Sequence, residues 1–134
     1  MILKKLLFIF FLFLPSYSFS QDFKWTEILN NNDVSILVDT SRVKKIDGNI
    51  RVWVLQNYQT PRQNGYFTYQ SMIEYQELNC REDKILQLKQ TQFSNQSGVG
   101  SSIELPMDGK WNFITPSTRW DVTLKYICSL KIKY

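Results

Sequence analysis

Residues 50–58 (IRVWVLQNY) decide the fold, because they predict a strand that is apolar on both faces. Successive side chains of a strand alternate between its two faces, so Val52 and Val54 would lie on one face and Trp53 and Leu55 on the other. A strand at the edge of a sheet or on its surface rarely has this composition. We therefore expect residues 50–58 to be central in a sheet.

Residues 34–39 (VSILVD) predict a second strand, because apolar side chains recur there at every other position. The face that we expect to be buried carries Val34, Ile36 and Val38. A shorter segment, residues 23–29, precedes this strand and ends at the polar cluster of residues 30–33 (NNND). This cluster is typical of a turn between two strands.

The stretch that follows the central strand, residues 59–65, predicts an interruption of the sheet. Pro61 has no amide hydrogen to donate to a strand ladder, and the pair Asn64 and Gly65 is typical of a tight turn. We therefore expect the ladder to break here and a new strand to begin near Tyr66.

The remaining strands are expected to continue an antiparallel meander. Residues 71–79 and 85–93 predict a hairpin, because the four charged residues at 81–84 (REDK) between them are costly to bury. Shorter strands are expected within residues 99–105 and 111–114, where prolines and glycines separate the apolar runs.

The C-terminal segment allows two interpretations. Residues 122–134 alternate as a strand would, but an apolar face with the spacing i, i+4, i+7 and i+8 favours a helix. That face consists of Trp120, Leu124, Ile127 and Cys128. Thr115 followed by Pro116 is typical of a helix start, because a threonine hydroxyl can cap free amides and proline fits the first turn. The pattern by itself favours the helix only slightly.

The N-terminus predicts a cleaved export signal at residues 1–20. Lys4 and Lys5 precede the apolar residues 6–14, and we expect cleavage before Gln21. At about 1.5 Å per residue, this apolar run covers less than half of the roughly 30 Å hydrocarbon core of a bilayer. A stable membrane helix is therefore disfavoured.

After cleavage, residues 21–134 have the size of one domain. The formal charge of +4 falls to +2 without the two lysines of the signal, which is too little to predict nucleic-acid binding. Residues 16–22 contain no cysteine, so we expect no lipid anchor. The expected location is the periplasm or the outside of the cell, with the cell surface as a further place of display.

Two cysteines, Cys80 and Cys128, remain in the exported part. In an oxidising compartment a disulfide between them is the default expectation, with two free thiols as the alternative. Zinc is a poor alternative, because the chain has no histidine and the cysteines lack a close ligand spacing. We expect no metal and no other cofactor.

The absence of histidine also excludes Ser-His-Asp and Cys-His nucleophile systems and the usual histidine-bearing metal hydrolases. The pair Gly98 and Gly100 opens no predicted helix, which argues against a phosphate-binding loop. A catalytic pair of carboxylates stays open, because such residues meet only in three dimensions. The sequence thus favours a protein that is not an enzyme.

Several short motifs occur together in an order and spacing typical of one known family. They are residues 34–40, Val52-Trp53-Val54, Leu78-Asn79-Cys80, Phe93 with Gly98 and Gly100, Ile114-Thr115-Pro116, and Ile127-Cys128. Through this ordered set, residues 25–128 resemble the surface-adhesin protein E family. The set includes both cysteines, although none of its motifs is diagnostic alone.

The resemblance implies an α+β fold, with a single antiparallel meandering sheet of about six strands and one C-terminal helix packed on a face. It implies that Cys80, at the end of a strand, pairs with Cys128 in the helix. It also decides the C-terminal segment in favour of a helix, at about residues 116–129.

The resemblance further implies a non-catalytic role in binding host surface or matrix proteins. A family name is a weaker argument for function than a site. The family's namesake resembles an anchored lipoprotein, whereas the expected anchor cysteine is missing here. A periplasmic structural or inhibitory protein of the cell envelope, without host contact, is therefore the alternative function.

The candidate partner-binding residues are Arg62, Tyr66, Phe67 and Tyr69. Arginine and aromatic side chains most often anchor protein contacts, and here they follow the predicted turn. The competing interpretation is that Phe67 and one tyrosine belong to the core. The four tryptophans are expected to pack inside the domain, because their large apolar area is rarely left in solvent. They are Trp25, Trp53, Trp111 and Trp120.

Overall fold

The computed structural model describes residues 22–130, so the expected signal at residues 1–20 lies outside the described residues. Within this range one sheet, one α-helix and a short 3-10 turn form the domain. The strands are β1 (Trp25–Asn30), β2 (Val34–Asp39), β3 (Lys44–Ile46), β4 (Asn49–Asn64), β5 (Phe67–Asn79), β6 (Lys84–Phe93), β7 (Ser102–Glu104) and β8 (Trp111–Phe113). The 3-10 turn η1 comprises Gln96–Gly98, and the helix α1 comprises Arg119–Ser129.

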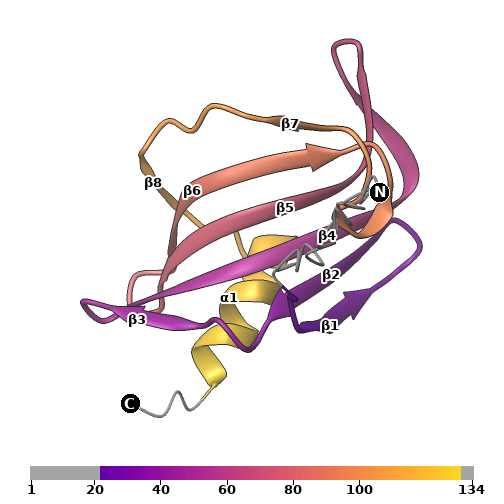
Figure 1. Ribbon diagram of the computed structural model, residues 1–134. Helices are drawn as coiled ribbons and strands as arrows, with labels where there is room; N and C mark the ends of the chain where they lie inside the picture. The colour runs from indigo at the N-terminus through magenta and orange to yellow at the C-terminus, as the bar shows by residue number, and fades with distance from the viewer. Residues whose placement is uncertain (1–21, 131–134) are drawn as a thin grey trace, which may run out of the picture.

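The sheet is an antiparallel meander, as predicted. Its strands follow the order β1-β2-β4-β5-β6-β7, and every pairing is antiparallel. Two short strands add to this path, because β3 pairs with β4 and β8 pairs with β6. The helix α1 lies against one face of the sheet, behind the strands in the view of Figure 1.

Strand β4 lies between β2 and β5, which confirms the central position predicted for residues 50–58. Val52, Val54 and Leu55 are all buried there. The hairpin predicted around residues 81–84 is confirmed as well, with β5 and β6 as its arms.

The expectation that β2 is buried on a single face is wrong. Ser35 and Asp39, on the face opposite the valines, are buried too. Ser35 donates a hydrogen bond to Glu27, and Oδ1 of Asp39 accepts hydrogen bonds from the amide and the hydroxyl of Ser41. The second carboxylate oxygen of Asp39 makes no hydrogen bond and lies 3.6 Å from Nε of Arg42. Polar side chains can be buried in a sheet when their hydrogen bonds are made.

The interruption predicted at residues 59–65 is confirmed in part. The ladder is irregular here and a new strand begins at Phe67, but β4 itself continues to Asn64. The ladder with β5 changes register between Asn57 and Arg62. Pro61 is exposed and falls inside this irregular stretch. Because the pairing is irregular here, the missing amide hydrogen of the proline removes no regular hydrogen bond of the ladder. The strand can therefore include the proline.

The C-terminal segment is a helix, but it begins later than expected. Thr118 is the N-cap, and its hydroxyl accepts a hydrogen bond from the Asp121 amide at 3.4 Å. Ser117 has a φ of 66°, outside the right-handed helical region, so the backbone at Pro116 cannot continue directly into α1. The helix ends at Ser129, as expected. Within residues 22–130, no helix has both the length and the apolar character needed to cross a membrane.

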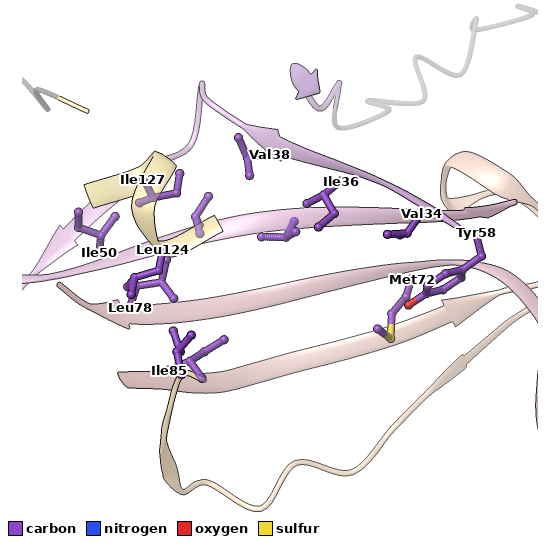
Figure 2. Packing of buried hydrophobic residues seen from close by; sticks show 13 residues of the cluster. Val34, Ile36, Val38, Ile50, Tyr58, Met72, Leu78, Ile85, Leu124 and Ile127 are labelled. Atoms are coloured by element: carbon purple, nitrogen blue, oxygen red, sulfur yellow. The ribbon is translucent and has the colours of Figure 1, made fainter. Parts of the chain in front are cut away.

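The core lies between α1 and the sheet (Figure 2). Leu124 and Ile127 of the helix lie over Ile50 and Leu78 of the central strands, which confirms the predicted apolar helix face. At the end of α1, Cys128 forms a disulfide with Cys80, whose position directly follows β5, with a Cα–Cα distance of 5.8 Å. The expected pairing of the cysteines is confirmed.

Three of the four tryptophans pack as expected. Trp25 stacks on Phe23, Trp53 stacks on Tyr75, and Trp120 packs against the core. Trp111 is the exception, with 39% of its surface exposed. It lies on the short strand β8, where the sheet ends and nothing in the described part of the chain fully covers it.

Candidate partner-binding site

The candidate residues lie on a hairpin that extends beyond the rest of the sheet. Pairing of β2 with β4 ends at Tyr58, and pairing of β6 with β5 ends at Ser71. Beyond these points, the ladder between β4 and β5 joins residues 62–64 to residues 67–69, and the Gln59 amide donates a hydrogen bond to the Asp33 carbonyl. We call residues 59–70 the β4–β5 tip, which projects at the upper right in Figure 1.

A two-residue turn closes the tip. Asn64 pairs with Phe67 in the ladder, so the turn consists of Gly65 and Tyr66 rather than of the predicted pair Asn64 and Gly65. Gly65 has a φ of 59°, and Tyr66 does not have a positive φ. A positive φ at the first turn residue alone is typical of a type II′ turn, which matches the twist of a hairpin.

Tyr66 is fully exposed at the end of the tip. Phe67, the next residue, is half-buried. An exposed tyrosine offers a large apolar ring together with a hydroxyl that can donate or accept a hydrogen bond. Tyr66 is thus the candidate residue whose chemistry is entirely available to a partner.

Arg62 is held at the base of the tip by two contacts. Its guanidinium forms an ion pair with Asp33, with an N–O distance of 3.1 Å. The same guanidinium lies over the ring of Tyr58, 3.8 Å from the centroid. Arg62 therefore contributes to the anchoring of the tip on the sheet.

Tyr69 belongs to the core side of the tip, which confirms that one candidate tyrosine is a packing residue. It is the direct ladder partner of Arg62 and makes an edge-to-face contact with Tyr58, with ring centroids 5.7 Å apart. A further hydrogen bond runs from the Asn64 side chain to Gln92 of β6. These contacts brace the tip at both strands.

The structure therefore divides the four candidates into two groups. Tyr66 and Phe67 lie at the end of the tip, whereas Arg62 and Tyr69 flank Tyr58 at its base. The sequence pattern placed all four in one loop and did not distinguish between them. The alternation of side chains along a strand could have distinguished the two groups only if the sequence had predicted that β4 extends to residue 64.

Below the tip, the helix-covered face of the sheet contains a buried polar network that the sequence analysis missed. Glu74 has no exposed surface and accepts hydrogen bonds from the side-chain amides of Gln56, Gln76 and Gln87. Burial raises the pKa of Glu74, and the hydrogen bond from Gln76 and the charge of Arg119 oppose this rise. In sequence these residues are polar positions scattered over three strands, so no local signal connects them.

Tyr58 links this network to the tip. Its hydroxyl donates a hydrogen bond to Gln56, and burial raises the pKa of Tyr58 to about 12 against the opposing charges of Arg119 and Arg62. The tyrosine is therefore neutral throughout the physiological range. The described part of the chain contains no cluster of three or more acidic, histidine or cysteine residues that could hold a metal ion.

Two further exposed aromatic residues were missed, and both lie on β8. Phe113 has 75% of its surface exposed, and Trp111 is two positions before it. The sequence signal was available, because a short strand after a proline- and glycine-bearing connection is typical of a sheet edge.

The antiparallel meander, the helix tied to it by a disulfide and the protruding aromatic hairpin define a small α+β domain. The model of the surface-adhesin protein E family matches residues 25–129, most of the chain. The protein therefore belongs to the surface-adhesin protein E family. No curated protein matches the chain in sequence.

Solved structures of Haemophilus influenzae protein E share the fold. One is similar with a TM-score of 0.59 and 14% sequence identity, and the match covers 78% of this chain and 83% of that chain. A second crystal form has a TM-score of 0.62 at 14% identity, covering 78% and 87% of the two chains. The protein from non-typeable H. influenzae has a TM-score of 0.55 at 13% identity, covering 78% and 75%. Identities this low show a common fold alone.

Proposed function

We propose that this protein is an exported, non-catalytic binding module whose β4–β5 tip contacts a protein partner, such as a host matrix protein or a protein of the bacterial envelope. Membership of the surface-adhesin protein E family supports a binding role. The observation that carries the proposal is the full exposure of Tyr66 at the end of a braced hairpin.

The bracing favours binding because it lowers the cost of ordering the tip. Immobilising a flexible loop on association opposes binding, and a preformed loop avoids most of that cost. Here Arg62 holds the base through Asp33 and Tyr58, and Asn64 holds the opposite side through Gln92. Tyr66 is therefore presented on a rigid support.

The contact is expected to depend on apolar area more than on charge. The one arginine at the base of the tip is already paired with Asp33. A neutralised cation steers a partner weakly, so the association rate should change little with ionic strength. This distinguishes a tip contact from adsorption of the basic protein to an acidic surface.

The test compares Tyr66→Ala with the wild-type protein in quantitative pull-downs from host matrix proteins and from envelope extracts in parallel. Removal of an anchoring tyrosine is expected to weaken the partner's affinity about 10-fold or more, as for other interface hot spots. Trp111→Ala is the matched control, because it removes an exposed aromatic ring far from the tip along the chain. Full retention of every partner by Tyr66→Ala would contradict the proposal.

Tyr66 is a better target than its neighbours, because its side chain is fully exposed and its removal should leave the fold unchanged. Arg62→Ala would remove the ion pair with Asp33 and the contact with Tyr58, and Tyr69→Ala would remove a ring from the core side. Fractionation of the native cells completes the test. Recovery in the periplasm alone would assign the partner to the envelope and exclude direct host contact.

A further inference from the structure

We infer that Asn64, at the end of the β4–β5 tip, is a site of spontaneous deamidation, which replaces its side-chain amide by a carboxylate. Asn64 is the only asparagine in the chain that a glycine follows. Because glycine has no side chain to shield its amide nitrogen, that nitrogen can approach the asparagine side chain closely. The modification stands on this chemistry alone, whereas its effect on partner binding rests on the proposed function.

The reaction joins the two neighbouring residues in a ring. Base removes the proton of the Gly65 amide, and the nitrogen forms a bond with Cγ of Asn64. The bond between Cγ and Nδ2 breaks, and Nδ2 takes up a proton and leaves as ammonia. Water then opens the five-membered succinimide at either of its carbonyls, which yields aspartate or isoaspartate. One water is consumed and one ammonia is released, with no change of oxidation state.

The structure leaves both reacting groups accessible. Asn64 and Gly65 are exposed, and no atom of a residue beyond the chain neighbours lies within 4 Å of the position that a Cβ of Gly65 would occupy. Among residues 22–130, none accepts a backbone hydrogen bond from the Gly65 amide. Hydroxide from the solvent can therefore reach this amide.

Ring closure requires Asn64 to leave its extended conformation, and the tip resists this only weakly. Asn64 and Phe67 form the last pair of the ladder, and no third strand in the described part of the chain pairs with them. The hydrogen bond from Asn64 to Gln92 must also open, whereas the contacts of Arg62 lie at the base of the tip and stay intact. The end of a hairpin opens far more readily than the core of a sheet. The folded protein should therefore react almost as fast as an unfolded peptide.

The products alter the support of Tyr66. A carboxylate has no hydrogen to donate, so the hydrogen bond that residue 64 donates to Gln92 is lost. In isoaspartate the main chain also runs through Cβ, which adds one backbone atom directly before the two-residue turn. Because the length and type of the turn set the twist of a hairpin, this extra atom disturbs the end of the ladder. Deamidation should therefore loosen the tip and weaken the partner contact.

The test follows the purified, disulfide-bonded protein over time in mildly alkaline buffer. Mass mapping after reduction should place a gain of one mass unit at residue 64, together with release of ammonia. We expect the rate to lie within about 10-fold of that of a synthetic peptide of residues 59–70. Asn95, which Gln96 follows, is the internal control and should stay unmodified over the same period. A reaction of the protein slower than this limit, or an equally fast reaction at Asn95, would overturn the inference.

Asn64→Gln is the matched control for the effect on binding. Glutamine keeps a side-chain amide, but it would have to close a six-membered ring, which is much slower. Aged and fresh samples of both proteins are compared in pull-downs from host matrix proteins and envelope extracts. Ageing should lower the retention of partners by the wild type about 5-fold or more and leave that by Asn64→Gln unchanged.

The outcomes separate this inference from the proposed function. Equal retention by aged and fresh wild-type protein would overturn the effect of deamidation on the tip, provided that Tyr66→Ala loses the same partners. If Tyr66→Ala retains every partner, the proposed function fails instead. The mass measurement at residue 64 then still decides whether the modification occurs.

Discussion

At the scale of single residues, Glu74 shows how the fold changes the chemistry of a side chain. A carboxylate without exposed surface is costly, and the structure offsets this cost with three glutamine amides and with Arg119 at the beginning of α1. These groups favour the ionised form, yet burial outweighs them and raises the pKa of Glu74. Protonation of this residue should therefore favour folding.

The pH dependence of stability tests this balance. The pKa of Glu74 is raised in the folded state above the 4.5 of the free side chain, so between these two values the folded protein binds more protons than the unfolded chain. The contribution of Glu74 to stability is thus most favourable below pH 4.5 and declines as the pH rises through the folded pKa. Thermal unfolding between pH 4 and 8 should show this decline in the wild type and a flatter profile in Glu74→Gln. Parallel profiles for the two proteins would contradict it.

At the scale of elements, α1 shows that helix-start signals can be right in kind and wrong in position. Thr115 and Thr118 are both threonines near the start, but only Thr118 caps the helix. Asp121 stabilises the N-terminal end of the helix. It accepts a hydrogen bond from the Ser117 amide at 2.9 Å and forms an ion pair with Lys125. The hydrogen bond with Lys125, followed by that from Ser117, lowers the pKa of Asp121.

The two threonines make a matched pair for mutation. Thr118→Ala should lower the free energy of unfolding by about 1 kcal/mol, because an N-cap hydroxyl is lost. Thr115→Ala should change it by less than about 0.5 kcal/mol, because Thr115 is exposed and its side chain caps nothing. Urea unfolding of both variants measures the difference. An equal loss of unfolding free energy in the two would contradict the assignment of Thr118 as the N-cap.

At the scale of the whole molecule, the disulfide joins the two parts of the fold. Cys80 follows a central strand and Cys128 lies in the last turn of the helix, so the bridge holds α1 on the sheet beside Ile127. An 11-residue helix is too short to be stable alone, and most of its stability must come from this packing. The bridge limits how far the helix can separate from the sheet in the unfolded chain.

Removal of the bridge should have a large effect on global stability. Cys80→Ser and Cys128→Ser each open the same loop, which spans 48 residues. On the chain-entropy model this costs about 4 kcal/mol, enough to lower the melting temperature by more than about 10 °C in a domain of this size. The two variants should melt at similar temperatures, and the wild type in dithiothreitol should approach them. Unchanged melting of both variants under non-reducing conditions would contradict this role.

The sequence alone determined the features that depend on local order. The central strand at residues 50–58 followed from apolar side chains on both faces, and the hairpin at residues 81–84 followed from four consecutive charges that resist burial. Alternation and turn chemistry act between near neighbours, so they can be recognised without knowledge of the rest of the chain.

Only the tertiary structure decided what depends on distant segments meeting. It continued β4 past Pro61, exposed Tyr66 while packing Tyr69, and buried Glu74 among glutamines of three strands. The physical reason is that burial and hydrogen bonding are properties of a side chain's neighbours in space. For these residues, most of those neighbours come from other strands or from the helix.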